Sequence, residues 1–195
     1  MKINYNLKMK QQLATLSSKP KLLLHVCCAP CSSAVIEKLK QYFDITLYYF
    51  NPNTYPQDEY DLRANQFSKL TSLPLIVCDY DHNTFLQTVK DVKHSVEGGE
   101  RCQRCIKLRL EQSFKYAVNN NYDYITTTLS ISPHKDANFI NLCGEKFSSI
   151  YNIKYLYADF KKENGYLDSI NLSNKFNLYR QNYCGCEFSM QSKDK

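Results

Sequence analysis

The chain has 195 residues, of which 43% are hydrophobic, so it is long enough to bury the core of one ordinary domain. No apolar run reaches the roughly 18 residues of a membrane helix, and the N-terminal stretch lacks the apolar segment of a secretory signal. We therefore expect a soluble, cytoplasmic protein with no membrane contact. The formal net charge of +6 fits a polyanionic partner without requiring one.

Apolar runs alternate with stretches of helical spacing along the whole chain. In chain order, the pattern predicts a strand at 21–26, a helix at 31–43, a strand at 44–50, a helix at 55–72, a strand at 73–80, helices at 82–92 and 102–120, a strand at 122–130, a helix at 135–152 and a strand at 153–160. Beyond residue 160 we expect only short segments. Such alternation predicts an α/β fold, a parallel sheet flanked by helices in a single doubly wound domain.

Ligands of doubly wound folds collect beyond the carboxyl ends of the strands, and cysteines lie at that position here. Cys27 and Cys28 directly follow the first expected strand, and Cys31 is about one helical turn further on. The free N–H groups and dipole of a helix N-terminus lower a thiol pKa and suit it to bind a cation. The alternative is that Cys27 only ends a strand as a small buried residue.

Two further cysteine pairs follow later in the chain. Cys102 and Cys105 have C-x-x-C spacing at the start of an expected helix, where positions three apart face the same way. Cys184 and Cys186 flank a glycine, a spacing found in metal sites. The other two cysteines, Cys78 and Cys143, lie in apolar patterns and are interpreted as core residues.

The total of nine cysteines is odd, and a reducing cytosol disfavours disulfides, so metal binding or redox chemistry is expected. Seven grouped thiols exceed the four ligands that close a structural zinc site. A [4Fe–4S] cluster on four thiolates, with an adjacent mononuclear metal, uses them better. A zinc-stabilised RNA-binding module and a thiol–disulfide oxidoreductase remain as alternatives. On this interpretation, residues 1–20 are an N-terminal extension and 21–195 a single α/β iron–sulfur domain.

Six segments, read in order, resemble the cobalamin-independent epoxyqueuosine reductases of the QueH family. They are HVCCAPCSS, YFNPNTYPQDEYDLR, EGGERCQRC, SISPHKDAN, ADFKK and LYRQNYCGCEFS, and the resemblance runs from about Leu22 to Met190. It implies the reduction of epoxyqueuosine to queuosine at the wobble position of tRNA, the last step in making that base. It also implies a Rossmann-like fold of the HUP type, a [4Fe–4S] cluster, and beside it a metal held by two cysteines and an acidic residue.

The resemblance also implies which residues bind the metals. The expected set is Cys27, Cys28, Cys31, Cys102, Cys105, Cys184 and Cys186. We place Cys102 and Cys105 on the cluster and expect iron as the second metal. Some members of the family carry an aspartate where this chain has Cys31, so the second metal here has either an all-sulfur environment or a different carboxylate, such as Asp136 or Asp159.

The chemistry calls for a proton source, an external electron donor and RNA contacts. His134, in the loop after the fourth expected strand, is the candidate proton donor, although a lone loop histidine is as often a hydrogen-bonding partner. His25, inside the first strand, is expected to be buried. Basic and aromatic side chains near the cysteine motifs are the candidate tRNA contacts: Tyr49, Tyr55, Arg101, Arg104, Lys107, Arg180 and Tyr183. Glu59 and Arg63 are interpreted as a simple ion pair one helical turn apart.

Overall fold

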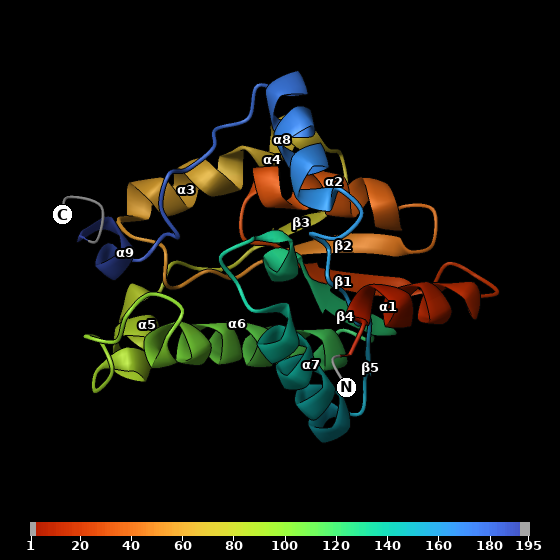
Figure 1. Cartoon of the computed structure of the whole chain (residues 1–195), viewed down its shortest axis with the longest axis horizontal. Helices are drawn as coiled ribbons and strands as arrows, with labels where there is room; N and C mark the ends of the chain where they lie inside the picture. Colours follow the sequence, from red (N-terminus) through yellow and green to blue (C-terminus); the bar gives the residue numbers. More distant parts are fainter. Residues whose placement is uncertain (1–2, 192–195) are drawn as a thin grey trace.

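A five-stranded, fully parallel sheet forms the centre of the protein, seen here in a computed structural model that describes residues 3–191 (Figure 1). The strands are β1 (Lys21–His25), β2 (Asp44–Tyr49), β3 (Leu75–Val77), β4 (Tyr124–Thr127) and β5 (Lys154–Tyr155). Their order is β3-β2-β1-β4-β5, so the chain first builds outward from β1 on one side and then crosses to the other. The expected Rossmann-like α/β fold is confirmed.

Helices cover both faces of the sheet. They are α1 (Tyr5–Ala14), α2 (Ala29–Leu39), α3 (Gln57–Asn65), α4 (Phe67–Leu70), α5 (His82–Val89), α6 (Glu100–Asn119), the short 3-10 helix η1 (Thr128–Ile131), α7 (Ala137–Tyr151), α8 (Gly165–Lys175) and α9 (Glu187–Gln191). In Figure 1, α2, α3, α4 and α8 lie above the sheet, whereas α5, α6 and α7 lie below it. No helix in the described part of the chain is both long and apolar enough to span a membrane.

The central strand β1 is buried on both faces. Leu22 and Leu24 point into the apolar core on the side of α2, and Leu23 points into the core on the side of α6, each with 0% of its surface exposed. Parallel strands covered on both faces are continuously apolar rather than alternating, which explains the Leu-Leu-Leu run. This double burial fixes the end of β1, and with it the position of the cysteines that follow.

Several expected elements differ in extent. The expected helix at 55–72 is divided into α3 and α4, and the expected strand at 122–130 ends at Thr127. There the Thr127 hydroxyl oxygen accepts a hydrogen bond from the Leu129 backbone N–H at 3.2 Å and caps η1. The strands expected at 73–80 and 153–160 shorten to β3 and β5. Residues 1–20 contain α1, whose Met9 and Leu13 pack into the core beside Leu22.

Helix α8 was not expected, because its sequence lacks an apolar stripe. Its buried positions include Ser169 and Ser173, and small side chains let it pack closely against α2. The Ser173 hydroxyl donates to the Ser169 carbonyl at 2.5 Å, so the buried polar group is satisfied. A helix that packs through serines carries no hydrophobic periodicity for a sequence pattern to detect.

Helix α7 touches β5 closely at Gly144. A Cβ added there would lie 2.3 Å from the ring of Tyr155, which is buried. We predict that Gly144→Ala lowers the free energy of unfolding by about 1–3 kcal/mol through overpacking. Denaturant unfolding measures this, with Ser149→Ala on the exposed face of α7 expected to stay within about 0.5 kcal/mol of the parent. Equal free energies of unfolding for Gly144→Ala and Ser149→Ala would contradict the close approach of Gly144 to the Tyr155 ring.

Candidate functional site

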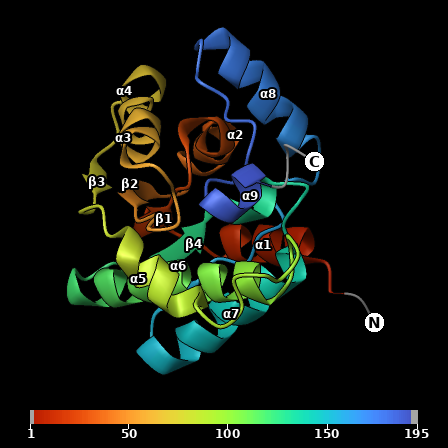
Figure 2. The same cartoon turned by 90° about the vertical axis from the view of Figure 1, so that its left-hand side faces the viewer.

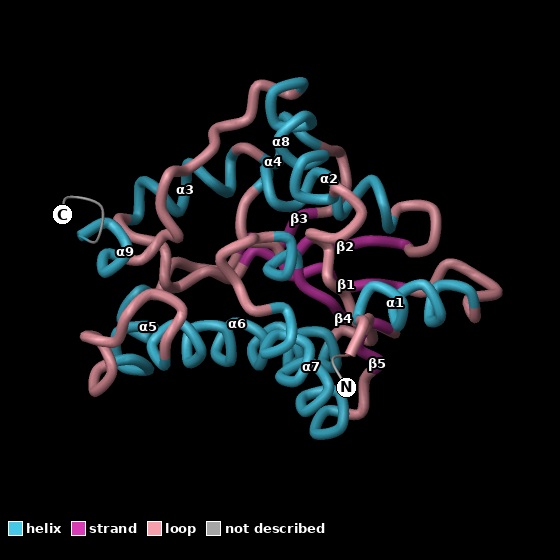
Figure 3. The backbone as a smooth tube through the Cα atoms, in the orientation of Figure 1, coloured by secondary structure: helices cyan, strands magenta, loops and turns pink. Residues whose placement is uncertain are grey.

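The first cysteine group lies at the topological switch point of the sheet. β1 neighbours β2 on one side and β4 on the other, and the strand order changes direction between β1 and β4, although all strands run parallel. Such a change opens a crevice beyond the carboxyl ends of these strands. Figure 3 shows loops gathered at this end of the strands, between α3 and α6. Cys28 is the N-cap residue of α2, and Cys31 lies in the first turn of that helix. The placement of this group at a strand end and a helix N-terminus is thus confirmed.

The three sulfurs of this group are close enough to share one metal. The Sγ atoms of Cys27, Cys28 and Cys31 all lie within 4.8 Å of one another. Hydrogen bonds from Cys28 and Cys31 hold the pKa of Cys27 well below its usual range, and the contact with Cys27 raises the pKa of Cys28 to about 12. The hydrogen bonds within the group therefore favour ionisation at Cys27 over the other two thiols. A bound cation would replace the remaining protons.

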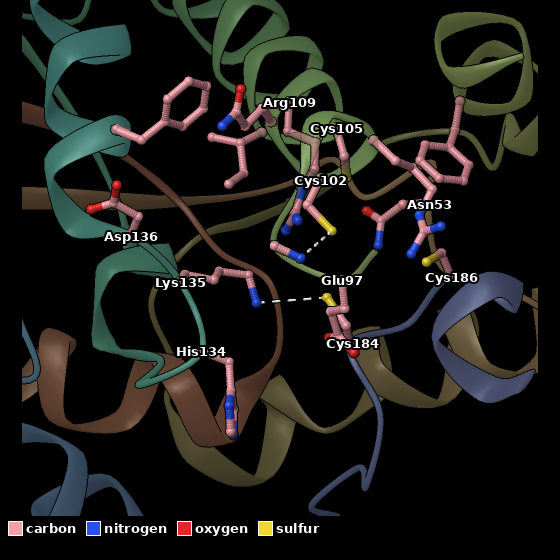
Figure 4. Close-up of a pocket in the computed structure, with 16 residues that line it drawn as sticks. Asn53, Glu97, Cys102, Cys105, Arg109, His134, Lys135, Asp136, Cys184 and Cys186 are labelled. Carbon is pink, nitrogen blue, oxygen red and sulfur yellow. Dashed lines mark hydrogen bonds between the residues drawn. The ribbon is translucent and has the colours of Figure 1, made fainter. Parts of the chain in front are cut away.

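The other two groups face each other across one cavity. Cys102 and Cys105, on the first turns of α6, line it together with Cys184 and Cys186 from the loop before α9 (Figure 4). Figure 2 shows α9 between the α2–α8 layer and the α6 layer. Burial raises the pKa of Cys105 to about 12 and also raises that of Cys186. Four thiols from two distant segments thus share one enclosure.

A second cavity joins this one to the first cysteine group. Cys27, Cys31 and Cys184 line it, and its wall shares Cys184, Arg109 and Lys135 with the cavity described above. Two cavities with common wall residues adjoin each other. The structure therefore brings all three cysteine groups to one region, the switch point of the sheet.

One sulfur in each of the two later cysteine groups accepts a hydrogen bond from a donor outside the groups. The Lys135 ammonium donates to Cys184 Sγ at 3.6 Å, and the Gly98 backbone N–H donates to Cys102 Sγ at 3.3 Å (Figure 4). The interaction with Cys184 raises the pKa of Lys135, so this half-buried amine stays protonated. Such donors stabilise thiolates and sulfur-bound metal centres.

The loop that carries Cys184 is held by the Glu59–Arg63 pair. Arg63 Nε lies 2.7 Å from Glu59 Oε1, and these side chains are only 3% and 11% exposed. Arg63 also donates to the Cys184 carbonyl at 3.2 Å, and the Tyr55 N–H donates to the Gly185 carbonyl at 2.8 Å. The sequence predicted the ion pair, but its anchoring of Cys184 joins residues 121 positions apart, which local spacing cannot reveal.

The candidate proton donor lies at the mouth of the site. His134 is exposed and lines both cavities, and Figure 4 shows its ring below Lys135, away from Cys102. His25 is completely buried, as expected, with its ring nitrogens 2.8 Å from Thr127 Oγ1 and 3.2 Å from the Phe50 carbonyl. Burial lowers the pKa of His25 to about 3, so it remains neutral.

The two candidate carboxylates have structural partners. Asp136 lines the first cavity but caps α7, accepting a hydrogen bond from the Asn138 N–H at 2.8 Å. Asp159 lies 3.5 Å from the Lys161 ammonium and lines neither cavity.

The candidate tRNA contacts divide into interior and surface residues. Tyr49 is 0% exposed and its hydroxyl donates to the Tyr60 carbonyl, so it offers no ring face for stacking. Arg101 is 5% exposed and donates to two backbone carbonyls of the preceding loop. Arg104 pairs with Asp91 and Glu100. These three side chains have roles within the fold.

The remaining candidates are more accessible. Lys107 is exposed, with its ammonium above the Phe139 ring. Arg180 and Tyr183 line the second cavity, and the Tyr183 hydroxyl donates to the carbonyl of the exposed Tyr55 at 2.7 Å. Arg180 and Tyr183 therefore share a cavity wall with Cys27, Cys31 and Cys184.

The Arg63 anchor predicts a stability effect. We expect Arg63→Met to lower the free energy of unfolding by about 3 kcal/mol, because it leaves the Glu59 carboxylate buried without its partner. Adding Glu59→Met should recover part of this loss in a double-mutant cycle. Lys115→Met, which breaks an exposed pair of the same spacing with Glu111, should cost no more than about 0.5 kcal/mol. If denaturant unfolding shows that Arg63→Met and Lys115→Met lower the free energy of unfolding by the same small amount, Arg63 is not a buried anchor.

Comparison with known proteins agrees with this arrangement. The family described as "Epoxyqueuosine reductase QueH" matches residues 22–192. The epoxyqueuosine reductase QueH of Staphylococcus epidermidis is 41% identical, over 96% of this chain and 85% of that protein. That of Streptococcus pyogenes is 39% identical, over 96% and 78%, and that of Thermotoga maritima is 34% identical, over 87% and 90%. The chain belongs to the QueH family of epoxyqueuosine reductases.

Proposed function

We propose that this protein reduces epoxyqueuosine to queuosine at the wobble position of tRNA, the last step in making that base. One observation carries the proposal beyond family membership. Three cysteine groups, separated by more than 150 residues between Cys27 and Cys184, adjoin one another at the switch point of the sheet. Since the substrate is tRNA, we place the reaction in the cytoplasm.

The residues present fit a [4Fe–4S] cluster with an adjacent mononuclear iron. Thiolates are the ligands that iron–sulfur clusters use, and a single zinc leaves three of the seven grouped sulfurs without a function. The N–H donors on Cys102 and Cys184 are of the kind that stabilise such centres. We assign Cys102 and Cys105 to the cluster. The rest of the ligand set comes from Cys27, Cys28, Cys31, Cys184 and Cys186.

The reaction removes one oxygen from the substrate and consumes two electrons and two protons. When bound, the cluster and iron supply one-electron transfer and Lewis acidity, and an external low-potential donor supplies the electrons. The protein positions the substrate and delivers protons. An N–H of the His134 imidazole, at the mouth of both cavities, is the proposed proton source as the C–O bond breaks.

Contacts to the anticodon are proposed at the rim of the second cavity. Arg180 would pair with phosphate, and Tyr183 would stack on an unpaired base or on the modified base. Tyr55 and Lys107 extend this surface as exposed residues. Arg104 also lies at the surface, where Asp91 and Glu100 already neutralise its charge.

The test is conversion of epoxyqueuosine-containing tRNA by anaerobically reconstituted protein with a low-potential reductant. Nucleoside analysis should show queuosine, and the protein should be brown and contain several irons per chain. Replacing Cys102 or Cys105 with serine should lower the rate about 100-fold or more, because a metal ligand is lost. The matched control is Cys143→Ala, in the core outside the cysteine groups.

Two outcomes would contradict the proposal. A colourless preparation that holds only zinc and still forms queuosine would exclude the iron–sulfur assignment. Protein with an intact cluster that forms no queuosine would favour the RNA-binding alternative.

Cys31 is tested separately, as a ligand of the second metal. Because aspartate can also bind iron, Cys31→Asp should retain part of the activity and of the second metal, whereas Cys31→Ala should lose both. Metal analysis and the same tRNA assay measure this. Equal activity and equal metal content in the two variants would leave Cys31 with a packing role only.

A further inference from the structure

A buried arginine lies among the thiols without a carboxylate partner. Arg109 is 3% exposed and lies on α6, one turn beyond Cys105, where it lines both cavities. Its guanidinium donates to Asn51 Oδ1, and its Nε has no hydrogen-bond partner within residues 3–191. No ion pair of Arg109 occurs among those residues. A permanent positive charge is therefore held inside the protein beside thiols, with no carboxylate paired to it among the described residues.

The carboxylates that line the first cavity do not pair with Arg109. Glu97 and Asp136 line the first cavity, but Glu97 is exposed and Asp136 caps α7. A second cation, the half-buried Lys135, donates to Cys184 Sγ and adds to the positive charge. Burying an ion without a partner is strongly unfavourable. These cavities are consequently suited to an occupant with net negative charge.

Asn51 fixes the position of Arg109 relative to the first cysteine group. Asn51 is 1% exposed, and its Nδ2 donates at 3.0 Å to the carbonyl of Val26, the residue before Cys27. The same side chain accepts the bond from Arg109. Asn51 therefore links Arg109 directly to the segment that carries the first cysteine group.

We propose that Arg109 is the fixed countercharge of the sulfur-bound metal centre, that Asn51 positions it, and that its charge raises the reduction potential of the cluster. The inference rests on the proposed function. A cluster held by four thiolates carries net negative charge, and that charge grows when it accepts an electron. A fixed cation beside it stabilises the reduced state more than the oxidised state, so reduction becomes easier.

The test is a potentiometric titration of the reconstituted full chain, in which the electron paramagnetic resonance signal of the reduced cluster is measured at each potential. Arg109→Gln removes the charge, and Asn51→Asp neutralises it by giving Arg109 a carboxylate partner. We expect both potentials to fall by at least 59 mV, the one-electron equivalent of a tenfold change in equilibrium constant. Arg109→Lys should stay near the parent. Lys115→Gln, which removes an exposed charge from the same helix, should leave the potential unchanged.

The possible failures can be distinguished. If the parent holds no cluster, the proposed function fails and the countercharge role with it. If the parent and variants hold full clusters but the potentials of Arg109→Gln and Asn51→Asp match that of the parent, only the role of Arg109 is overturned. If Arg109→Gln does not fold, the reduction potential of Asn51→Asp alone tests the role of Arg109, because that variant keeps the guanidinium. An equal fall in Lys115→Gln would also overturn the proposal, because the effect would then not be local.

Discussion

The site depends on the double burial of β1. A strand covered by apolar side chains on both faces has a fixed end, and here that end lies beside the carboxyl end of β4 at the switch point of the sheet. Cys27 and Cys28 leave the strand at this position, and His134 and Lys135 follow β4 at the same edge. The sheet thus supplies a rigid edge, to which α6 and the loop before α9 bring the remaining thiols.

Charge is the second constraint, because thiols gathered in one enclosure cannot all ionise without compensation. In the first group, hydrogen bonds from its neighbours lower the pKa of Cys27, and the contact with Cys27 raises the pKa values of Cys28 and Cys31. The protein also places Arg109 and Lys135 in the walls without carboxylate partners among its described residues. Thiolates and cations therefore form one electrostatic unit, in which a metal centre would replace the sulfur-bound protons.

Local patterns predicted the parts of the site but not its assembly. The Leu-Leu-Leu run predicted β1 and hence the place of Cys27, and the C-x-x-C spacing predicted a helix start at Cys102. The burial of Arg109 was not predicted, because an arginine four residues after a cysteine on a helix is ordinarily solvated, and here its burial depends on Asn51 from another segment. Tyr49 is a candidate tRNA contact by sequence, but its side chain is buried because its strand is covered on both faces. Contacts distant in sequence account for each difference.

The central claim is that three cysteine groups of this chain hold one iron-containing centre at the switch point. Anomalous diffraction at the iron absorption edge, from crystals of the anaerobically reconstituted protein, tests it most directly. The account predicts strong iron peaks inside the two adjoining cavities, within bonding distance of sulfurs that include Cys102 and Cys105, with Arg109 beside them. Iron located elsewhere, or a lone zinc bound only by Cys27, Cys28 and Cys31, would contradict it.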